Sequence, residues 1–255
     1  MSVLNAFRMD GQVAIVTGAG AGNGKAIARI FAGAGAAVVV GDRDGDRAVA
    51  AAHEMRDSGA KAIGVACDVT READLAAIVA AALAAFAEIT VLVNGAGGGG
   101  PRPFDMPMAE FVHAYELNVF SAFRLCQLCA PEIEVAGGGA ILNMSSMAAV
   151  NRGARMAAYA SSKAAVDHLT RNLACDLGPR HIRVNAIAPG AIRTAALARV
   201  LTADVERAMI GRTPMHRLGE SADIAYAALF LCSPAAPWIS GEVLAVNGGG
   251  MQELD

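Results

Sequence analysis

The sequence lacks an apolar segment long enough to cross a membrane, although its composition is apolar. Hydrophobic residues make up 55% of the 255 residues, and the mean hydropathy is +0.41. The apolar run 76–87 has only twelve residues, whereas a membrane-spanning helix needs about 20. Residues 1–10 contain no apolar core of the kind found in secretion signals. We therefore expect a cytoplasmic protein whose surplus apolar side chains form a buried core and subunit contacts.

The chain also lacks a basic cluster and an even set of cysteines. The formal net charge is −3 at pH 7, so we expect no nucleic-acid partner. The cysteines number five, and an odd count without a secretion signal favours a reducing compartment. Cys126 and Cys129 have a C-x-x-C spacing, but they fall in a long apolar pattern without a second pair of ligands. We expect buried helix positions for both and no metal site.

No linker, repeat or low-complexity segment divides the chain, and short apolar strands alternate with helical patterns. The predicted strands are 13–16, 37–40, 62–66, 91–93, 140–144, 183–188 and 243–246. Several connections are ten residues or longer, which is typical of parallel strands joined by helices. The pattern predicts one α/β domain over residues 1–255, with a Rossmann-type, doubly wound, seven-stranded parallel sheet and helices on both faces.

Four helical segments are predicted in more detail. Thr70 is expected to cap a helix that runs to about residue 87. Pro107 is expected to begin a long helix with Asn118 in its middle. Residues 157–177 are rich in Ala and Leu and stop at a Gly-Pro pair, which predicts a helix. Residues 191–219 are expected to form a helical lid, whose apolar residues could cover a rigid apolar ligand: Leu197, Val200, Leu201, Met209 and Ile210.

The helix predicted at 157–177 carries Tyr159 and Lys163, four residues apart and hence on one face. An ammonium beside a phenol favours the phenolate. Lowering the pKa of Tyr159 from its usual value of about 10 would make it an acid or base usable near neutral pH. The alternative for an isolated pair of this kind is a surface tyrosine and lysine.

Two glycine-rich turns follow predicted strands. Residues 17–24 connect a strand to a helix, and glycines there let a pyrophosphate approach the backbone at the helix N-terminus. About twenty residues later, Asp42 can accept hydrogen bonds from ribose hydroxyls and repel a 2′-phosphate; the alternative is an ordinary turn residue. Residues 94–100 form the second turn, which indicates backbone packed against a ligand or else a flexible loop.

Together these motifs resemble the short-chain dehydrogenase/reductase family. The shared motifs, in the family's order, are Thr17-Gly-x-x-x-Gly-x-Gly24, Asp68, Asn94-x-Ala-Gly97, Asn118, Ser146, Tyr159-x-x-x-Lys163 and Pro189-Gly190. Within the family, the chain is most similar to the bacterial 7α-hydroxysteroid dehydrogenases. That likeness depends on residues 97–108, 115–120, 146–149, 229–234 and 248–254.

The resemblance implies a catalytic tetrad of Asn118, Ser146, Tyr159 and Lys163. Tyr159 would exchange a proton with the substrate hydroxyl while a hydride passes between the same carbon and the nicotinamide. Lys163 would hold the nicotinamide ribose and lower the pKa of Tyr159. Ser146 would bind the substrate oxygen and stabilise charge on it, and Asn118 would bind a water in a proton relay.

The resemblance also implies binding residues on two sides of the site. The cofactor residues would be Gly18, Gly22, Asn23, Gly24, Asp42, Asp68, Val69, Asn94, Gly95, Tyr159, Lys163, Ile192 and Thr194. The steroid contacts would be Gly99, Ser146, Asn151 and Tyr159. Residues 10–150 would form the cofactor half, and 190–219 the substrate side. The family usually has an asparagine where Gly95 stands, so the backbone would serve there.

The implied function is an NAD-dependent 7α-hydroxysteroid dehydrogenase that oxidises the 7α-hydroxyl of bile acids such as cholate to the ketone, as a homotetramer. Asp42 favours NAD over NADP, although Arg43 could tolerate NADP. One alternative is another reductase of the family, such as a 3-oxoacyl-carrier-protein reductase, which would need a basic docking patch; Arg171, Arg180 and Arg183 could supply a small one. A second alternative is a nucleotide-sensing protein without catalysis, although the intact tetrad argues against it.

Overall fold

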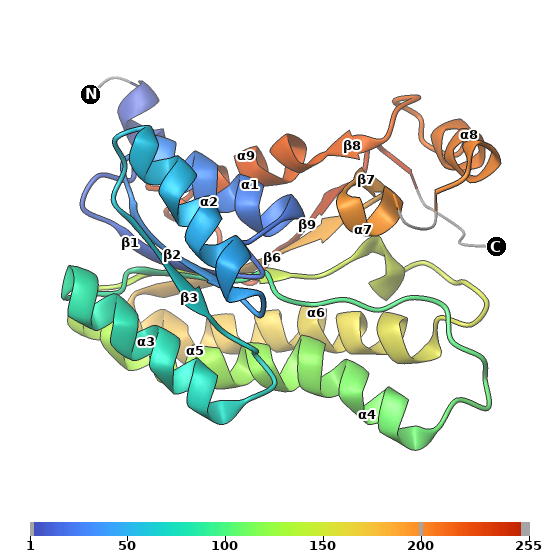
Figure 1. The fold of residues 1–255 in the computed structure, drawn as a ribbon, viewed down its shortest axis with the longest axis horizontal. Coiled ribbons are helices and arrows are strands. Elements are labelled where there is room, and N and C mark those ends of the chain that lie inside the picture. The colour runs from blue at the N-terminus through green and yellow to red at the C-terminus, as the bar shows by residue number, and fades with distance from the viewer. Residues whose placement is uncertain (1–2, 199–200, 251–255) are drawn as a thin grey trace.

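The computed structural model of this chain describes residues 3–198 and 201–250, which form a three-layer α/β domain (Figure 1). Its central sheet has seven parallel strands in the order β3-β2-β1-β4-β5-β6-β9. The strands are β1 (Val13–Thr17), β2 (Ala37–Asp42), β3 (Ala62–Ala66), β4 (Val91–Asn94), β5 (Gly139–Met144), β6 (Ile182–Pro189) and β9 (Val243–Val246). The predicted single-domain, doubly wound sheet is confirmed.

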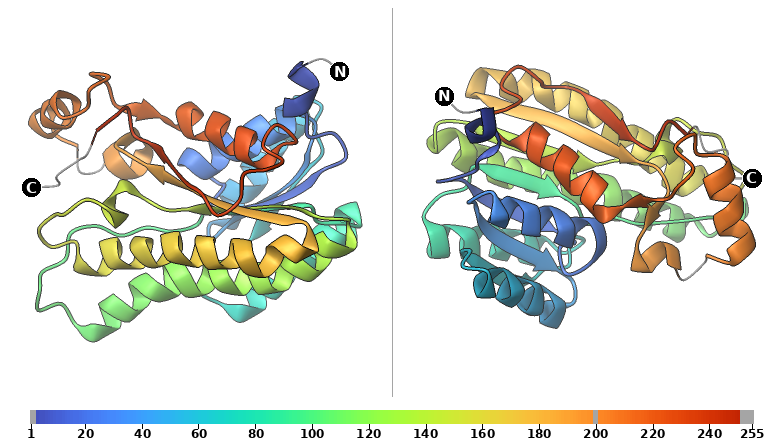
Figure 2. Two further views of the ribbon diagram at one scale, coloured as in Figure 1. Left: turned by 180° about the vertical axis from the view of Figure 1, so that it is seen from behind. Right: turned by 90° about the horizontal axis from the view of Figure 1, so that it is seen from above.

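Helices cover both faces of the sheet. The first face carries α1 (Gly22–Gly33), α2 (Gly45–Asp57) and α9 (Ser221–Cys232), and the second carries α3 (Glu72–Phe86), α4 (Met108–Tyr115), α5 (Ser121–Val135) and α6 (Ala157–Leu177) (Figures 1 and 2). Since both faces are covered, β1 in the middle of the sheet is buried at all five positions, whereas the edge strands β3 and β9 are partly exposed. This explains why the strands appear in the sequence as continuous apolar runs.

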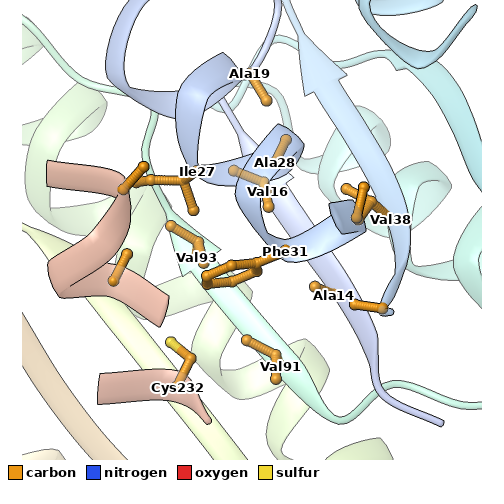
Figure 3. Packing of buried hydrophobic residues seen from close by; sticks show 14 of the residues in the cluster. Ala14, Val16, Ala19, Ile27, Ala28, Phe31, Val38, Val91, Val93 and Cys232 are labelled. Carbon is orange, nitrogen blue, oxygen red and sulfur yellow. The ribbon is translucent and has the colours of Figure 1, made fainter. Parts of the chain in front are cut away.

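The core is divided by the sheet, because successive strand residues point to opposite faces. Val16 belongs to the cluster under α1, α2 and α9, whereas its neighbour Ile15 belongs to the cluster under α3, α5 and α6. In the first cluster, Phe31 of α1 packs beside Val91 and close to Cys232 of α9 (Figure 3). The order of strands reverses between β1 and β4, so the loops after these strands diverge and open a crevice at this edge.

One predicted detail of the helices is wrong. Thr70 does not cap α3; its hydroxyl and its N–H both donate to the carboxylate of Asp68, and α3 begins only at Glu72. The long helix predicted after Pro107, with Asn118 in its middle, is confirmed. It runs from Met108 through a π-helical turn at Glu116–Phe120, which contains Asn118, into α5, and this turn was not predicted.

The predicted lid contains two short helices, α7 (Ala195–Ala198) and α8 (Ala203–Gly211). Its ends are joined by a small parallel pair of strands, β7 (Ile192–Arg193) and β8 (Gly219–Glu220), which the sequence did not predict. The pair fixes both ends of the lid next to the carboxyl end of β6. No helix in the described part of the chain is both long and apolar enough to cross a membrane.

Candidate active site

A cavity of about 300 Å³ opens at the carboxyl ends of β4, β5 and β6 and under the lid. Many of the residues that line it were singled out from the sequence, among them Asn23, Gly95, Ser146, Asn151, Tyr159, Lys163, Ile192, Thr194, Leu197 and Met209. Residues separated by almost two hundred positions therefore meet in one place. A larger hollow, of about 1050 Å³, lies beside Gly11, Gly35 and Lys61 near the opposite strand ends. None of the candidate site residues lines it.

Lys163 is fixed beneath this cavity on the sheet-facing side of α6. Its side chain is 4% exposed, and its amine donates a 2.7 Å hydrogen bond to the main-chain carbonyl of Met144 at the end of β5. The same nitrogen lies 5.9 Å from the centre of the Tyr159 ring. Burial lowers the pKa of Lys163 to about 8, and the negative charge of Asp167 opposes that effect.

The expected lowering of the Tyr159 pKa is not what the structure gives. Burial raises the pKa of Tyr159, and a hydrogen bond with Ser146 opposes the rise without overcoming it. The Lys163 amine, 5.9 Å from the ring centre, is held by the Met144 carbonyl. Ser146 favours the phenolate, and its hydroxyl also accepts a hydrogen bond from the N–H of Ala148.

Asn118 holds the second glycine-rich turn in position. Its amide oxygen accepts a 3.0 Å hydrogen bond from the N–H of Gly98, and its amide nitrogen donates to the Gly98 carbonyl at 2.9 Å. The nitrogen also donates to the hydroxyl of Ser162, which donates to the carbonyl of Tyr159. Asn118 thus ties the turn to the first part of α6. The expected water contact of Asn118 is not tested by this geometry.

Gly99 covers the ring of Tyr159. Its φ angle is +148°, in a region that favours glycine, and an added Cβ would lie 2.5 Å from Cδ2 of Tyr159. A second close approach occurs at Gly95, where an added Cβ would lie 2.5 Å from the carbonyl oxygen of Thr17. The asparagine usual in the family would therefore need a shift of this backbone. The N–H groups of Gly95 and Ala96 instead donate to the Thr17 hydroxyl.

The first glycine-rich turn, which includes Gly18, joins β1 to α1, and Gly22 and Gly24 lie in the first turn of α1. The carboxylate of Asp42, at the end of β2, accepts hydrogen bonds from the N–H of Gly20 at 2.9 Å and from that of Asp44 at 3.0 Å. It is thereby fixed beside the turn. Asn23 contributes a buried amide oxygen that has no hydrogen-bond partner within the part of the chain that the structure describes.

Three other predicted cofactor residues differ in their surroundings. The pKa of Asp68 is lowered, chiefly by the hydrogen bonds from Thr70, and its neighbour Val69 is buried. The side chain of Asn94 is also buried, and its nitrogen donates to the amide oxygen of Asn143 at 2.9 Å. Asn94 therefore belongs to the protein interior beneath the cavity, and its side chain does not line the cavity.

The substrate side combines polar and apolar groups. Both polar atoms of the Asn151 amide are buried and have no hydrogen-bond partner in residues 3–198 and 201–250, although Asn151 lines the cavity. Of the apolar lid residues predicted as ligand contacts, Leu197 and Met209 line the cavity. Val200 lies outside the described residues. Thr194 accepts a hydrogen bond from the N–H of Leu197, so its hydroxyl caps α7.

Two expectations about the rest of the chain have clear outcomes. Cys126 and Cys129 are buried in α5 as predicted, and burial raises the pKa of each thiol, to about 12 for Cys126. The basic patch considered for a carrier protein is weak. Arg180 pairs with Glu134 at 2.6 Å, and Arg183 donates to main-chain carbonyl groups.

One charged residue beside the site was not predicted from the sequence. Asp167 is only 7% exposed and lies one helical turn beyond Lys163 on the sheet-facing side of α6. Its spacing of four residues from Lys163 was a visible signal, because residues at this spacing share a helix face. Ser145, the buried neighbour of Ser146, also lines the cavity and was not predicted as a site residue.

Comparisons with known proteins agree with this geometry. A family model described as "Enoyl-(Acyl carrier protein) reductase" matches residues 18–251. The chain is 57% identical over 249 residues to the 7α-hydroxysteroid dehydrogenase of Escherichia coli strain K12, with 98% of each chain covered. It is 39% identical over 241 residues to the cis-4-hydroxycyclohexanecarboxylate dehydrogenase of Sinomonas cyclohexanicum, with 93% of this chain and 96% of that one covered.

A solved structure gives the same result at the level of the fold. The structure of a 7α-hydroxysteroid dehydrogenase complexed with NADH and 7-oxo glycochenodeoxycholic acid matches with a TM-score of 0.98 and 56% identity, and all of both chains is covered. The match includes the sheet, the turns after β1 and β4, and α6. The Tyr159 and Lys163 pair, the glycine-rich turns and these similarities together establish that the chain belongs to the short-chain dehydrogenase/reductase family.

Proposed function

We propose that this protein is an NAD-dependent 7α-hydroxysteroid dehydrogenase that oxidises the 7α-hydroxyl of bile acids such as cholate to the 7-ketone. One observation carries the proposal: the full-length match, at a TM-score of 0.98, to an enzyme complexed with NADH and a 7-oxo bile acid. The convergence of Ser146, Tyr159, Lys163 and Asn151 on a single cavity supports it.

In this proposal Tyr159 is the general base. It accepts the proton of the substrate hydroxyl, and the hydrogen bond with Ser146 stabilises the phenolate that does so. Ser146 also orients the substrate oxygen and stabilises negative charge on it. Lys163 contributes a positive charge below the ring, and Asn118 keeps the glycine-rich turn over that ring. Bound NAD would accept the hydride that leaves carbon 7.

The cofactor side suits NAD. The turn between β1 and α1 brings backbone N–H groups together at a helix N-terminus, where phosphate groups bind. The unpartnered amide oxygen of Asn23 is available for a ligand at this turn. The fixed carboxylate of Asp42 can bind ribose hydroxyls and repel a 2′-phosphate, so NAD is preferred over NADP. Ile192 and Thr194 are the proposed contacts for the carboxamide.

The substrate side suits a rigid apolar ligand with few polar groups. Leu197 and Met209 provide adaptable apolar surface on the lid, and the buried amide of Asn151 offers a donor and an acceptor. Because Ser146 and Tyr159 fix one hydroxyl and the lid fixes the ring plane, a 7β-hydroxyl points away from the base. A displacement of the reacting atom by about 1 Å can lower the rate roughly a hundredfold.

The test compares cholate with its 7β epimer and with 3α- and 12α-hydroxy bile acids, each with NAD and NADP. The expected result is a kcat/KM for cholate with NAD at least about a hundredfold above that for the 7β epimer. A 3-oxoacyl thioester serves as the control for the alternative reductase. Comparable rates for the two epimers, or a preference for the thioester, would contradict the steroid assignment and leave only the family.

The proposal extends to assembly and location. Exposed apolar side chains follow one another along α4, the π-helical turn and α5, namely Val112, Phe120 and Phe123. Cys126 faces the core and is not part of this surface. We propose that these helices, with α6, pair across a two-fold axis in a cytoplasmic homotetramer. Light scattering at micromolar concentration should give about four times the mass of 25.9 kDa; a monomer mass would contradict it.

A further inference from the structure

A row of buried polar side chains lies between β5 and α6, beneath the cavity. Lys163, Asp167 and Thr170 point to the sheet from successive turns of α6, and all three are buried. Thr170 accepts a hydrogen bond from Asn143 of β5. Asp167 is different, because its Oδ1 is buried without a hydrogen-bond partner among the described residues. The nearby hydroxyl of Ser145 is likewise buried without one.

Asp167 and Lys163 influence each other through space. The Lys163 amine donates its hydrogen bond to the Met144 carbonyl, and its interaction with Asp167 is electrostatic. Burial raises the pKa of the Asp167 carboxyl, while Ser145, Arg171 and Lys163 oppose the rise. In return, the charge of Asp167 raises the pKa of Lys163 against the larger effect of burial.

We propose that Asp167 is a positioning residue whose buried carboxylate balances the positive charge of the Lys163 amine beneath the active site. A buried amine strongly favours its neutral form unless an opposite charge is close. The Met144 carbonyl orients the amine but carries no full charge. Asp167 is buried one helical turn from Lys163 on the same side of α6, so it places a full negative charge on the side of the helix that carries the amine. The inference rests on the proposed role of Lys163 in binding the cofactor and assisting Tyr159.

Other charged groups near α6 do not take this role. On α6 itself, Arg171 is the second positive group that acts on Asp167. The elements packed against α6 contribute the hydroxyl of Ser145 from the end of β5. Their charged residues do not shift the pKa of Asp167: Glu110 and His113 of α4, Glu116 of the π-helical turn, Arg180 after α6 and Arg183 of β6.

The test is the pH dependence of the Asp167→Asn variant. Activity that needs a protonated Lys163 falls as the pH rises through the pKa of Lys163. Removing a nearby negative charge lowers that pKa, so the alkaline fall in kcat/KM should move to lower pH by about one unit. The dissociation constant for NADH, followed by fluorescence without any bile acid, should match that of the wild type at pH 6 and be larger at pH 8.

The control is Asp176→Asn, which removes the same charge from an exposed position on the same helix and should leave both profiles unchanged. Asp167→Ser is a second variant in case the asparagine variant does not fold, as judged by circular dichroism. An equal loss of activity at every pH would indicate a structural role and overturn the inference, as would unchanged profiles in both variants. Because the NADH measurement needs no steroid, it stands even if the substrate assignment fails.

Discussion

Lys163 should make the folded protein less stable at neutral pH than an apolar residue would. Its pKa is lowered from 10.5 to about 8, with burial as the first cause and Asp167 opposing. At about 1.4 kcal/mol per pH unit, this interval corresponds to about 3 kcal/mol. The side chain is buried, so water screens the charge of the amine very little. We therefore expect Lys163→Met to remove this destabilisation and so to raise the free energy of unfolding at neutral pH.

The sign follows from the protons bound in each state. Between pH 8 and 10.5 the unfolded chain keeps the Lys163 proton while the folded chain has lost it. Stability therefore rises with pH across this window, and the full cost of the buried amine is present below pH 8. In the methionine variant Asp167 loses its positive neighbour, which adds a penalty of its own.

The assay is urea unfolding of the wild type and Lys163→Met at several pH values from 7 to 10.5, without added nucleotide, since a bound ligand would itself add stability. The difference in unfolding free energy should change by about 3 kcal/mol between pH 8 and 10.5, in favour of the wild type as the pH rises. Lys61→Met, at an exposed position, is the control. A difference that stays constant across this window would refute the reasoning.

Three further predictions concern the active site. Gly99→Ala should lower kcat roughly a hundredfold, because the new Cβ would lie 2.5 Å from the Tyr159 ring and displace it; Gly100→Ala, with open space around its Cβ, should retain activity, and equal rates would contradict the argument. Tyr159→Phe should abolish turnover but leave NADH binding nearly intact, so substantial turnover would exclude Tyr159 as the base. Asp42→Ala should weaken NAD binding and reduce the ratio of kcat/KM with NAD to kcat/KM with NADP. Equal use of both cofactors by the wild type would exclude the hypothesis that Asp42 selects NAD.

The sequence predicted the sheet well because short apolar runs alternate with helical patterns along the chain. β3 and β9 have the predicted bounds, and so does α6. A continuous apolar run between glycines is a clear local signal. The π-helical turn at Asn118 has no such signal, since it shifts the hydrogen bonds by one residue without changing the apolar period. The pairing of β7 with β8 joins segments far apart in the chain, so no local pattern indicates it.

The sequence predicted which residues line the cavity, but it did not predict the direction in which the pKa of Tyr159 changes. Motif spacing was sufficient to bring Ser146, Tyr159 and Asn151 to one cavity. The sign of the pKa change at Tyr159 depends on how deeply the phenol is buried and on where the Lys163 amine points. Both are set by tertiary packing. The inward direction of the Asn94 side chain has the same origin, because its partner Asn143 comes from the neighbouring strand.

The sheet-facing side of α6 explains how the fold tolerates these buried polar groups. Near the site this side carries Lys163, Asp167 and Thr170, and further along it carries Leu173 and Leu177, both almost fully buried. Burying each leucine contributes about 2 kcal/mol, so the pair contributes about 4 kcal/mol. That offsets the cost of about 3 kcal/mol estimated for the buried amine. The far half of the helix thus stabilises its position, and the near half can hold a charge where an apolar residue would be more stable.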